Sequence, residues 1–333
     1  MSRDRGPRRL RRLERGALVA ASLTALSMTA SGCVVVHGER EVLPAATRAE
    51  AAKAMEQFVT AYNKADKAYD SSLDAGHVTG ALGDIDAARL KAGHTIDPDG
   101  NPSHTPLKLT DARYTIPKKA GWPRWFVADA RGNKGGDLRW LLVFTRDGLG
   151  ETWKAAYLTL VSPGTLPKVR EDANGLAEAV PADSAGLAVA PRDLSRDYVT
   201  YLKKGGRTFA PGPQTDRRRA QREKEAKRPG LVTQYIDEPL ISGDYAPLAL
   251  RTADGGALVF FTTRRYEKQT AAAGTTISAP NASVKALTTG EIKQSLTMEF
   301  VSNGVALDPE RDAGGGQVSV LSRLEGLTSA QGS

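Results

Sequence analysis

Cys33 is the only cysteine among the 333 residues of this chain. A single thiol cannot form an internal disulfide bond, so any fold of the chain is stabilised without one. The residue also has a distinctive position, immediately after an uncharged stretch near the N-terminus. The thiol therefore needs a role other than internal cross-linking.

The first 32 residues have the parts of an export signal. Residues 1–15 contain seven arginines and two acids, whereas residues 16–32 carry no charge and end in small side chains. A basic segment, an apolar segment and small residues in this order indicate a signal peptide over residues 1–32. An uncleaved anchor is disfavoured because a spanning helix needs about 20 mostly apolar residues. Two Arg-Arg pairs raise the question of twin-arginine export, but the residues after each pair fit that signal poorly, which favours Sec export.

The string Ala30-Ser31-Gly32-Cys33 resembles the lipobox of bacterial lipoproteins. The resemblance implies that Cys33 becomes the first mature residue, with its sulfur carrying a diacylglyceryl group built from fatty acids such as palmitate. Two acyl chains suffice for stable membrane attachment. The expected location is the outer face of the cytoplasmic membrane, with residues 33–46 as a tether. A lipidated thiol also excludes catalytic, redox and metal-binding roles for this cysteine.

The leader accounts for most of the net charge of +8. Without its seven arginines and two acids, the chain keeps 39 basic and 36 acidic residues, a net charge of +3. Nucleic acid is therefore not an expected partner.

Residues 47–165 are predicted to form a first α+β domain. A long helix over Arg48–Leu73 begins with the capping-box pair Thr47 and Glu50, and a second helix over residues 78–92 ends at Gly93. Period-two patterns then predict strands. The predicted strands are 107–109, 112–116, 125–128, 140–144 and 155–161, with a hairpin turn at 133–137.

Residues 166–191 are rich in Ala, Gly, Pro and acids, which is typical of a linker. A second α+β domain is predicted over residues 192–327, followed by a tail at 328–333. Its helix covers residues 193–203. Its predicted strands are 232–236, 245–251, 257–263, 292–301 and 318–324.

The hairpins at 126–146 and 248–264 resemble each other, with glycine-containing turns and similar strands. We therefore expect two similar domains, each an N-terminal helix packed on a curved antiparallel sheet. The alternative is that two hairpins with glycine turns look alike by chance. A helix followed by such a sheet resembles the nuclear transport factor 2 and cystatin folds, which is an analogy of fold only.

The segment from Lys203 to Arg228 contains ten basic and three acidic residues. One interpretation is an exposed helix that contacts an envelope polyanion or anionic lipid head groups. The residues proposed for that contact are Arg217, Arg218, Arg219 and Arg222. The other interpretation, a solvated helix with Arg/Glu pairs, is favoured on composition.

Trp122 is a candidate ligand contact because it lies in a loop, whereas the other tryptophans are expected to fill the sheet core. His94 and His104 flank a polar loop, but the loop lacks the spacing of a calcium or zinc site. We therefore predict no metal and no cofactor. No motif for a nucleophilic serine, phosphate loop or dinucleotide fold is present.

Three phrases, Gly121–Ala128, Gln234–Leu240 and Gly243–Leu248, together with the Cys33 leader, resemble uncharacterised exported lipoproteins of actinobacteria. The resemblance covers most of the chain and implies no catalytic residue. The function expected first is a membrane-tethered ligand-binding or protein-interaction module. The alternative is an enzyme that uses a concave pocket of a cone-like α+β domain.

Overall fold

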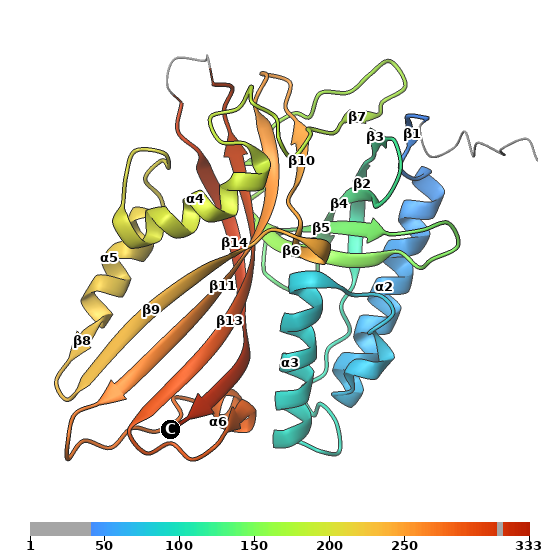
Figure 1. The fold of residues 1–333 in the computed structure, drawn as a ribbon. Coiled ribbons are helices and arrows are strands. Elements are labelled where there is room, and N and C mark those ends of the chain that lie inside the picture. The colour runs from blue at the N-terminus through green and yellow to red at the C-terminus, as the bar shows by residue number, and fades with distance from the viewer. Residues whose placement is uncertain (1–40, 312–315) are drawn as a thin grey trace, which may run out of the picture. The chain divides into compact units, whose positions relative to one another are not determined.

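The structure, a computed structural model, describes residues 41–311 and 316–333 (Figure 1). It combines helices with sheets whose longer strands pair antiparallel, which confirms the predicted α+β class. The helices are α2 (Arg48–Ala68), α3 (Gly80–Ile96), α4 (Pro191–Lys204), α5 (Asp216–Glu225) and α6 (Ala282–Leu287). The longer strands are β2 (Leu109–Thr115), β4 (Arg124–Gly132), β5 (Arg139–Arg146), β6 (Lys154–Val161), β9 (Leu231–Leu240), β11 (Ala257–Ala271), β13 (Ser295–Asp308) and β14 (Ser319–Gly332). The shorter strands are β1 (Leu43–Pro44), β3 (Pro117–Lys119), β7 (Ala177–Glu178), β8 (Lys227–Arg228), β10 (Leu248–Arg251) and β12 (Thr288–Thr289).

Local hydrogen bonds fix both ends of α2. The predicted capping box is present, because the Thr47 hydroxyl accepts from the Glu50 N–H at 3.1 Å and the Glu50 carboxylate accepts from the Thr47 N–H at 2.8 Å. The helix ends at Ala68, earlier than predicted, because Tyr69 adopts a left-handed conformation with a φ of 52°. The Tyr69 N–H donates to the carbonyl oxygen of Ala65.

The second helix, α3, continues to Ile96, so the prediction that it ends at Gly93 is wrong. Gly93 lies against the ring of Tyr69, and a Cβ added to it would come within 2.4 Å of that ring. The glycine therefore permits close contact with the end of α2 and does not terminate the helix.

The first sheet contains four antiparallel strands in the order β2-β4-β5-β6. The predicted strands at 125–128, 140–144 and 155–161 are confirmed, as is the hairpin between β4 and β5. Helix α2 covers one face of this sheet. Phe58 of α2 packs edge-on against Phe144 of β5, with ring centroids 5.9 Å apart.

The second sheet is larger, with the order β12-β14-β13-β11-β9-β8, and β10 also pairs with β11. Its strands are longer than predicted. Strand β11 has 15 residues, and β14 continues to Gly332, through residues expected to form a tail. Helix α3 lies close to β14, where a Cβ on Gly326 would approach Ile85 to 2.4 Å.

The two sheets share a core. One part comes from the second face of the four-stranded sheet, and the other part comes from β10, β11 and β13 of the larger sheet. The main contributors are Trp125, Val127, Leu141, Val143, Tyr157, Leu250, Leu258, Phe260 and Val305. The segment predicted as a linker crosses this interface, because Val169 and Ala179 form bridges with Thr252 and Leu250.

Helix α4 covers the opposite face of the larger sheet, where Tyr198 packs edge-on against Phe261 with ring centroids 5.3 Å apart. Residues 42–333 therefore form one compact unit with the layers α2, small sheet, large sheet and α4. The predicted division into two similar domains is not confirmed, because each sheet completes the core of the other.

Candidate functional site

Helix α5 is a basic helix with few apolar contacts. Asp216 lies in its first turn, and Arg222 and Lys224 lie in its last turn, which suits the helix dipole. Arg222 is the one buried residue among the ten of α5. Burial of apolar side chains therefore contributes little to holding this helix on the larger sheet.

Ion pairs hold α5 in place instead. Arg222 forms a two-pronged pair with Asp237 of β9, with N–O distances of 2.7 and 2.8 Å. Arg218, one turn earlier, donates to both carboxylate oxygens of Glu325 on β14 at 3.0 and 3.2 Å. The side chains of Arg222 and Asp237 are only 10% and 6% exposed, so neither charge of this pair faces open solvent.

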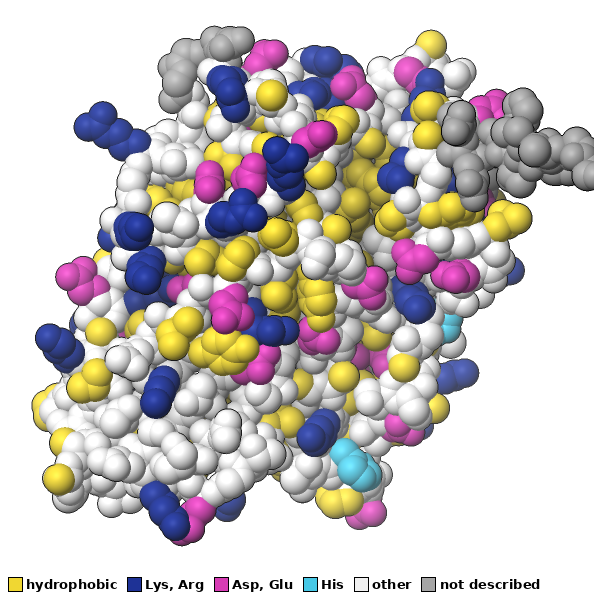
Figure 2. Space-filling model, in the orientation of Figure 1, with side chains coloured by type: hydrophobic (Ala, Val, Ile, Leu, Met, Phe, Trp, Pro, Cys, Tyr) yellow, Lys and Arg dark blue, Asp and Glu magenta, His cyan; other side chains and the backbone are white. Residues whose placement is uncertain are grey.

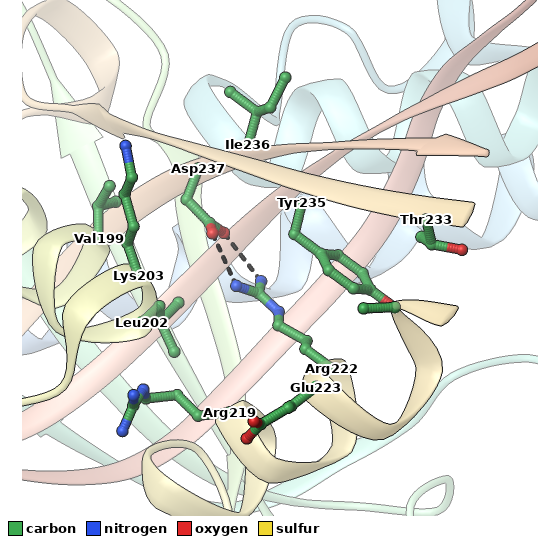
Figure 3. A pocket seen from close by; sticks show the side chains of 11 residues that line it. Val199, Leu202, Lys203, Arg219, Arg222, Glu223, Thr233, Tyr235, Ile236 and Asp237 are labelled. Carbon is green, nitrogen blue, oxygen red and sulfur yellow. Dashed lines mark hydrogen bonds and ion pairs between the residues drawn. The ribbon is translucent and has the colours of Figure 1, made fainter. Parts of the chain in front are cut away.

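A pocket of about 510 Å³ lies between α4, α5 and β9 (Figure 3). We call it the α4–α5 pocket. Val199 and Leu202 of α4 supply an apolar wall, and Lys203 and Arg219 supply positive charge. The side chain of Ile236 of β9 points to the opposite face of the strand from Tyr235 and Asp237 (Figure 3). The pair Arg222–Asp237 and the ring of Tyr235 line the side nearest the sheet. The complete lining is Val199, Leu202, Lys203, Arg219, Arg222, Glu223, Ala226, Thr233, Tyr235, Ile236 and Asp237.

The four arginines predicted as polyanion contacts differ in their surroundings. Arg218 and Arg222 turn toward the sheet and are ion-paired, as described above. Arg219 is half-buried, with its guanidinium 5.5 Å from the centre of the Tyr201 ring. Arg217 is exposed and forms no ion pair with the described residues. Figure 2 shows Lys and Arg side chains over the surface that carries α4 and α5, with acidic side chains between them.

Trp122, the predicted ligand contact, is half-buried between two arginines. The guanidinium groups of Arg124 and Arg146 lie 4.9 and 5.6 Å from the centre of its ring. The indole is thus already engaged by cations of its own chain. It does not line the α4–α5 pocket.

Cys33 lies outside the described residues, so its predicted lipidation is not addressed by the structure. His94 is exposed near the end of α3, while His104 contacts Asp66 through Nδ1 at 2.7 Å. Within residues 41–311 and 316–333, no three His, Cys, Asp or Glu side chains converge as a metal site would require. In the same ranges, no helix has the length and apolarity needed to cross a bilayer.

The partners of the α5 arginines were not identified from the sequence. Asp237, Arg265 and Glu325 lie just beyond the predicted strands 232–236, 257–263 and 318–324, in the parts by which the observed strands are longer. A detectable signal was the alternation of charge in two strands, Arg265 with Glu267 in β11 and Arg323 with Glu325 in β14. Residues two apart share a face of a sheet, so each strand presents a pair of opposite charges on one side.

The comparisons with known proteins identify one family and several relatives that match nearly the whole chain. A family model described as a domain of unknown function (DUF8094) matches residues 42–332. An uncharacterised lipoprotein of Streptomyces coelicolor is 71% identical over 332 residues, and one of Streptomyces avermitilis is 59% identical over 332 residues, each with full coverage of both chains. A second Streptomyces coelicolor lipoprotein is 26% identical and covers 94% of this chain and 92% of its own.

No solved structure matches the chain significantly, so the expected likeness to nuclear transport factor 2 and cystatin folds is not confirmed. The expected resemblance to uncharacterised lipoproteins is confirmed by the relatives. Because the family model spans nearly all described residues, the chain belongs to the DUF8094 family, whose members in Streptomyces include proteins named as lipoproteins.

Proposed function

We propose that this chain is a lipid-anchored, extracytoplasmic protein that binds a ligand in the α4–α5 pocket. The observation that carries the proposal is the combination of an apolar wall with two cations in one concave site. Lys203 and Arg219 form no ion pair with the described residues, whereas Arg222 in the same pocket is paired. Two positive charges are therefore available to a ligand.

This lining favours an amphiphilic ligand with a negative group. The volume of about 510 Å³ lies within the range typical of small-molecule sites. Val199 and Leu202 would contact an apolar chain or ring, and Lys203 and Arg219 would bind the anionic end. The ring of Tyr235 adds a flat apolar surface beside the Arg222–Asp237 pair.

Binding is proposed in preference to catalysis because of the exposure and pairing of the two acidic residues that line the pocket. Glu223 is exposed. Asp237 is buried, but Arg222 occupies both of its carboxylate oxygens. Acid–base catalysis commonly uses a carboxylate within reach of substrate together with a second catalytic group, and the lining offers only Glu223 beside an Asp237 already held by Arg222.

The anchor proposal rests on the leader sequence and on relatives named as lipoproteins. In this proposal Cys33 carries a diacylglyceryl group and tethers the folded unit to the outer face of the cytoplasmic membrane. Cys33→Ser should move the protein from the membrane fraction to the soluble fraction and remove the lipid mass from the N-terminal peptide. Retention of Cys33→Ser in the membrane would refute lipidation as the means of attachment.

The pocket proposal is tested by native mass spectrometry on the protein without residues 1–33, purified from a bacterium with an intact envelope. We expect a bound species of defined mass. Titration with monododecyl phosphate then provides a defined probe. The double variant Lys203→Gln/Arg219→Gln should bind this probe at least about 10-fold more weakly, since two charge-assisted contacts are lost.

Lys204→Gln is the matched control, because Lys204 is the next residue of α4, is exposed and does not line the pocket. It should bind the probe like the wild-type protein. Equal weakening by both changes would indicate general charge attraction. Equal binding by the wild-type protein and the double variant would contradict the proposed site.

A further inference from the structure

A second pocket lies on the other side of α5, between this helix and strands β9, β11 and β14. We call it the arginine pocket. Its volume is about 480 Å³. Its charged lining is Arg217, Arg218, Arg222, Glu225, Arg265, Glu267 and Glu325. We infer that the arginine pocket binds a tetrahedral oxyanion, the phosphate group of a small phosphorylated molecule.

The first argument is the sharing of one carboxylate by three guanidinium groups. Arg218 donates to Glu325 at 3.0 and 3.2 Å, and Arg265 donates to it at 3.0 and 3.1 Å. Arg323 from the same strand also binds Glu325. Arg265 has a second partner in Glu267. Three positive charges thus face two negative ones.

The second argument is burial. The side chains of Arg323 and Arg265 are 2% and 7% exposed, and that of Glu325 is 18% exposed. Burial of a charge is costly unless the charge is paired. Burial lowers the pKa of Arg218, and the positive charge of Arg323 lowers it further. Burial alone would raise the pKa of Glu325, but the three arginines hold it well below its usual range.

The third argument is the presence of free donors. Among the described residues, no acceptor bonds to the buried Nε of Arg218 or of Arg323. Arg218 lines the pocket, and the exposed Arg217 lies beside it on α5. Guanidinium groups bind phosphate oxygens in a two-pronged geometry, more strongly than neutral donors do. An oxyanion bound here would add negative charge and accept from Arg217 and Arg218, whereas Arg323 does not line the pocket.

The arginine pocket is separate from the α4–α5 pocket. The two lie on opposite sides of α5 and share only Arg222 and Tyr235 as a common wall. Arg222 is engaged with Asp237, and all three nitrogens of Arg265 bond to Glu325 or Glu267, so the oxyanion site depends on Arg217 and Arg218. Lys203 and Arg219 line only the α4–α5 pocket. The proposal for the α4–α5 pocket and the proposal for the arginine pocket can therefore be tested independently.

The test is calorimetric titration of the protein without residues 1–33 with inorganic phosphate and pyrophosphate, in chloride buffer of constant ionic strength. We expect saturable binding with a stoichiometry of one. Arg217→Gln should weaken binding about 5-fold, because it removes one nearby positive charge at an exposed position. Glu267→Gln should strengthen binding about 5-fold, because it removes a competing negative charge and frees Arg265.

The opposite effects of these two changes separate a binding role from a structural one, since mere damage to the fold would weaken binding in both. Arg192→Gln, at an exposed site on α4 outside both pockets, is the control that should leave phosphate binding unchanged. Absence of binding, or binding that Glu267→Gln fails to strengthen, would overturn the inference. Displacement of bound phosphate by vesicles containing phosphatidic acid would identify a lipid head group as the source, and lack of displacement would identify a soluble phosphate ester.

Discussion

Asp74 and Asp86 form a buried acid pair that makes stability depend on pH in a predictable direction. The two residues are 1% and 3% exposed, and the Oδ2 atom of each has no hydrogen-bond donor among the described residues, so a proton on Asp74 can be donated to Asp86. Arg89 donates to Asp86 at 2.8 and 3.1 Å and to Asp66 at 2.6 Å. Arginine donors thus reach Asp86 and Asp66 but not Asp74, and Asp74 is the member that keeps the proton.

Burial, together with the hydrogen bond to Asp86, raises the pKa of Asp74 to about 8. In the unfolded chain an aspartate titrates near pH 3.9, as a rough value. Between these pH values the folded protein holds a proton that the unfolded chain has released. The free energy of unfolding must therefore fall as the pH rises through this window.

The size of the effect follows from the shift. Each pKa unit is worth about 1.4 kcal/mol, so a shift of about four units sets an upper limit of roughly 5 to 6 kcal/mol. Relaxation and entry of water reduce the penalty for a buried charge. We expect this group to account for a loss of about 3 kcal/mol between pH 5 and pH 9.

Asp74→Asn should abolish this loss, because an amide can donate to Asp86 as the protonated acid does and cannot ionise. At pH 5 the variant should match the wild-type protein within about 1 kcal/mol, the usual net value of one hydrogen bond. At pH 9 it should be more stable by about 3 kcal/mol. Urea unfolding followed by circular dichroism, at intervals from pH 5 to pH 9, measures both values.

Asp70→Asn is the matched control, because Asp70 is exposed and caps the next turn through the Ser72 N–H at 2.9 Å. Asparagine caps equally well, so the pH dependence should stay as in the wild-type protein. A wild-type and an Asp74→Asn curve that run parallel from pH 5 to pH 9 would falsify the reasoning. Asp308, whose pKa burial raises to about 7, contributes equally to both curves and cancels in the difference.

Three further changes test the packing and the ion pairs in the same unfolding assay. Gly326→Ala should lower the free energy of unfolding by about 1–3 kcal/mol through overpacking against Ile85. The double variant Gly326→Ala/Ile85→Ala should lose less than the sum of the two single changes. Phe58→Ala should cost about 3–5 kcal/mol, because it empties the contact between α2 and the four-stranded sheet; a loss below 1 kcal/mol would contradict that packing. Glu325→Gln should cost about 3–5 kcal/mol, because it leaves buried arginines without a partner. Since the folded pKa of Glu325 is lowered, its contribution is lost as the pH falls, and the variant should show less acid destabilisation than the wild-type protein.

The local features of the fold were predictable because neighbouring residues determine them. Thr47 and Glu50 are three residues apart, and their reciprocal hydrogen bonds need no distant partner. The hairpin of β4 and β5 follows from a glycine-containing turn between two strand patterns. Helix α4 follows from apolar residues at helical spacing, all of which are buried.

The shared core was missed because the period-two pattern says which residues form a strand and not what covers its second face. Strand β5 contains the run Trp140–Phe144, in which every residue is buried. A continuous apolar run of this kind is typical of a strand covered on both faces. One helix can cover one face, so a second layer was implied, and it is the larger sheet that supplies it.

The candidate sites on α5 show why composition alone misjudges a basic helix. Arg218 and Arg222 are four residues apart and so lie on one face of the helix. That face meets Asp237 and Glu325, of which Glu325 lies 107 residues after Arg218 in the chain. A helix with one buried residue can therefore pack on a sheet when charged residues at this spacing lie opposite residues of the other charge on the strands. The arginines that remain for a ligand are those on the flanks of the docked face, and these line the two pockets.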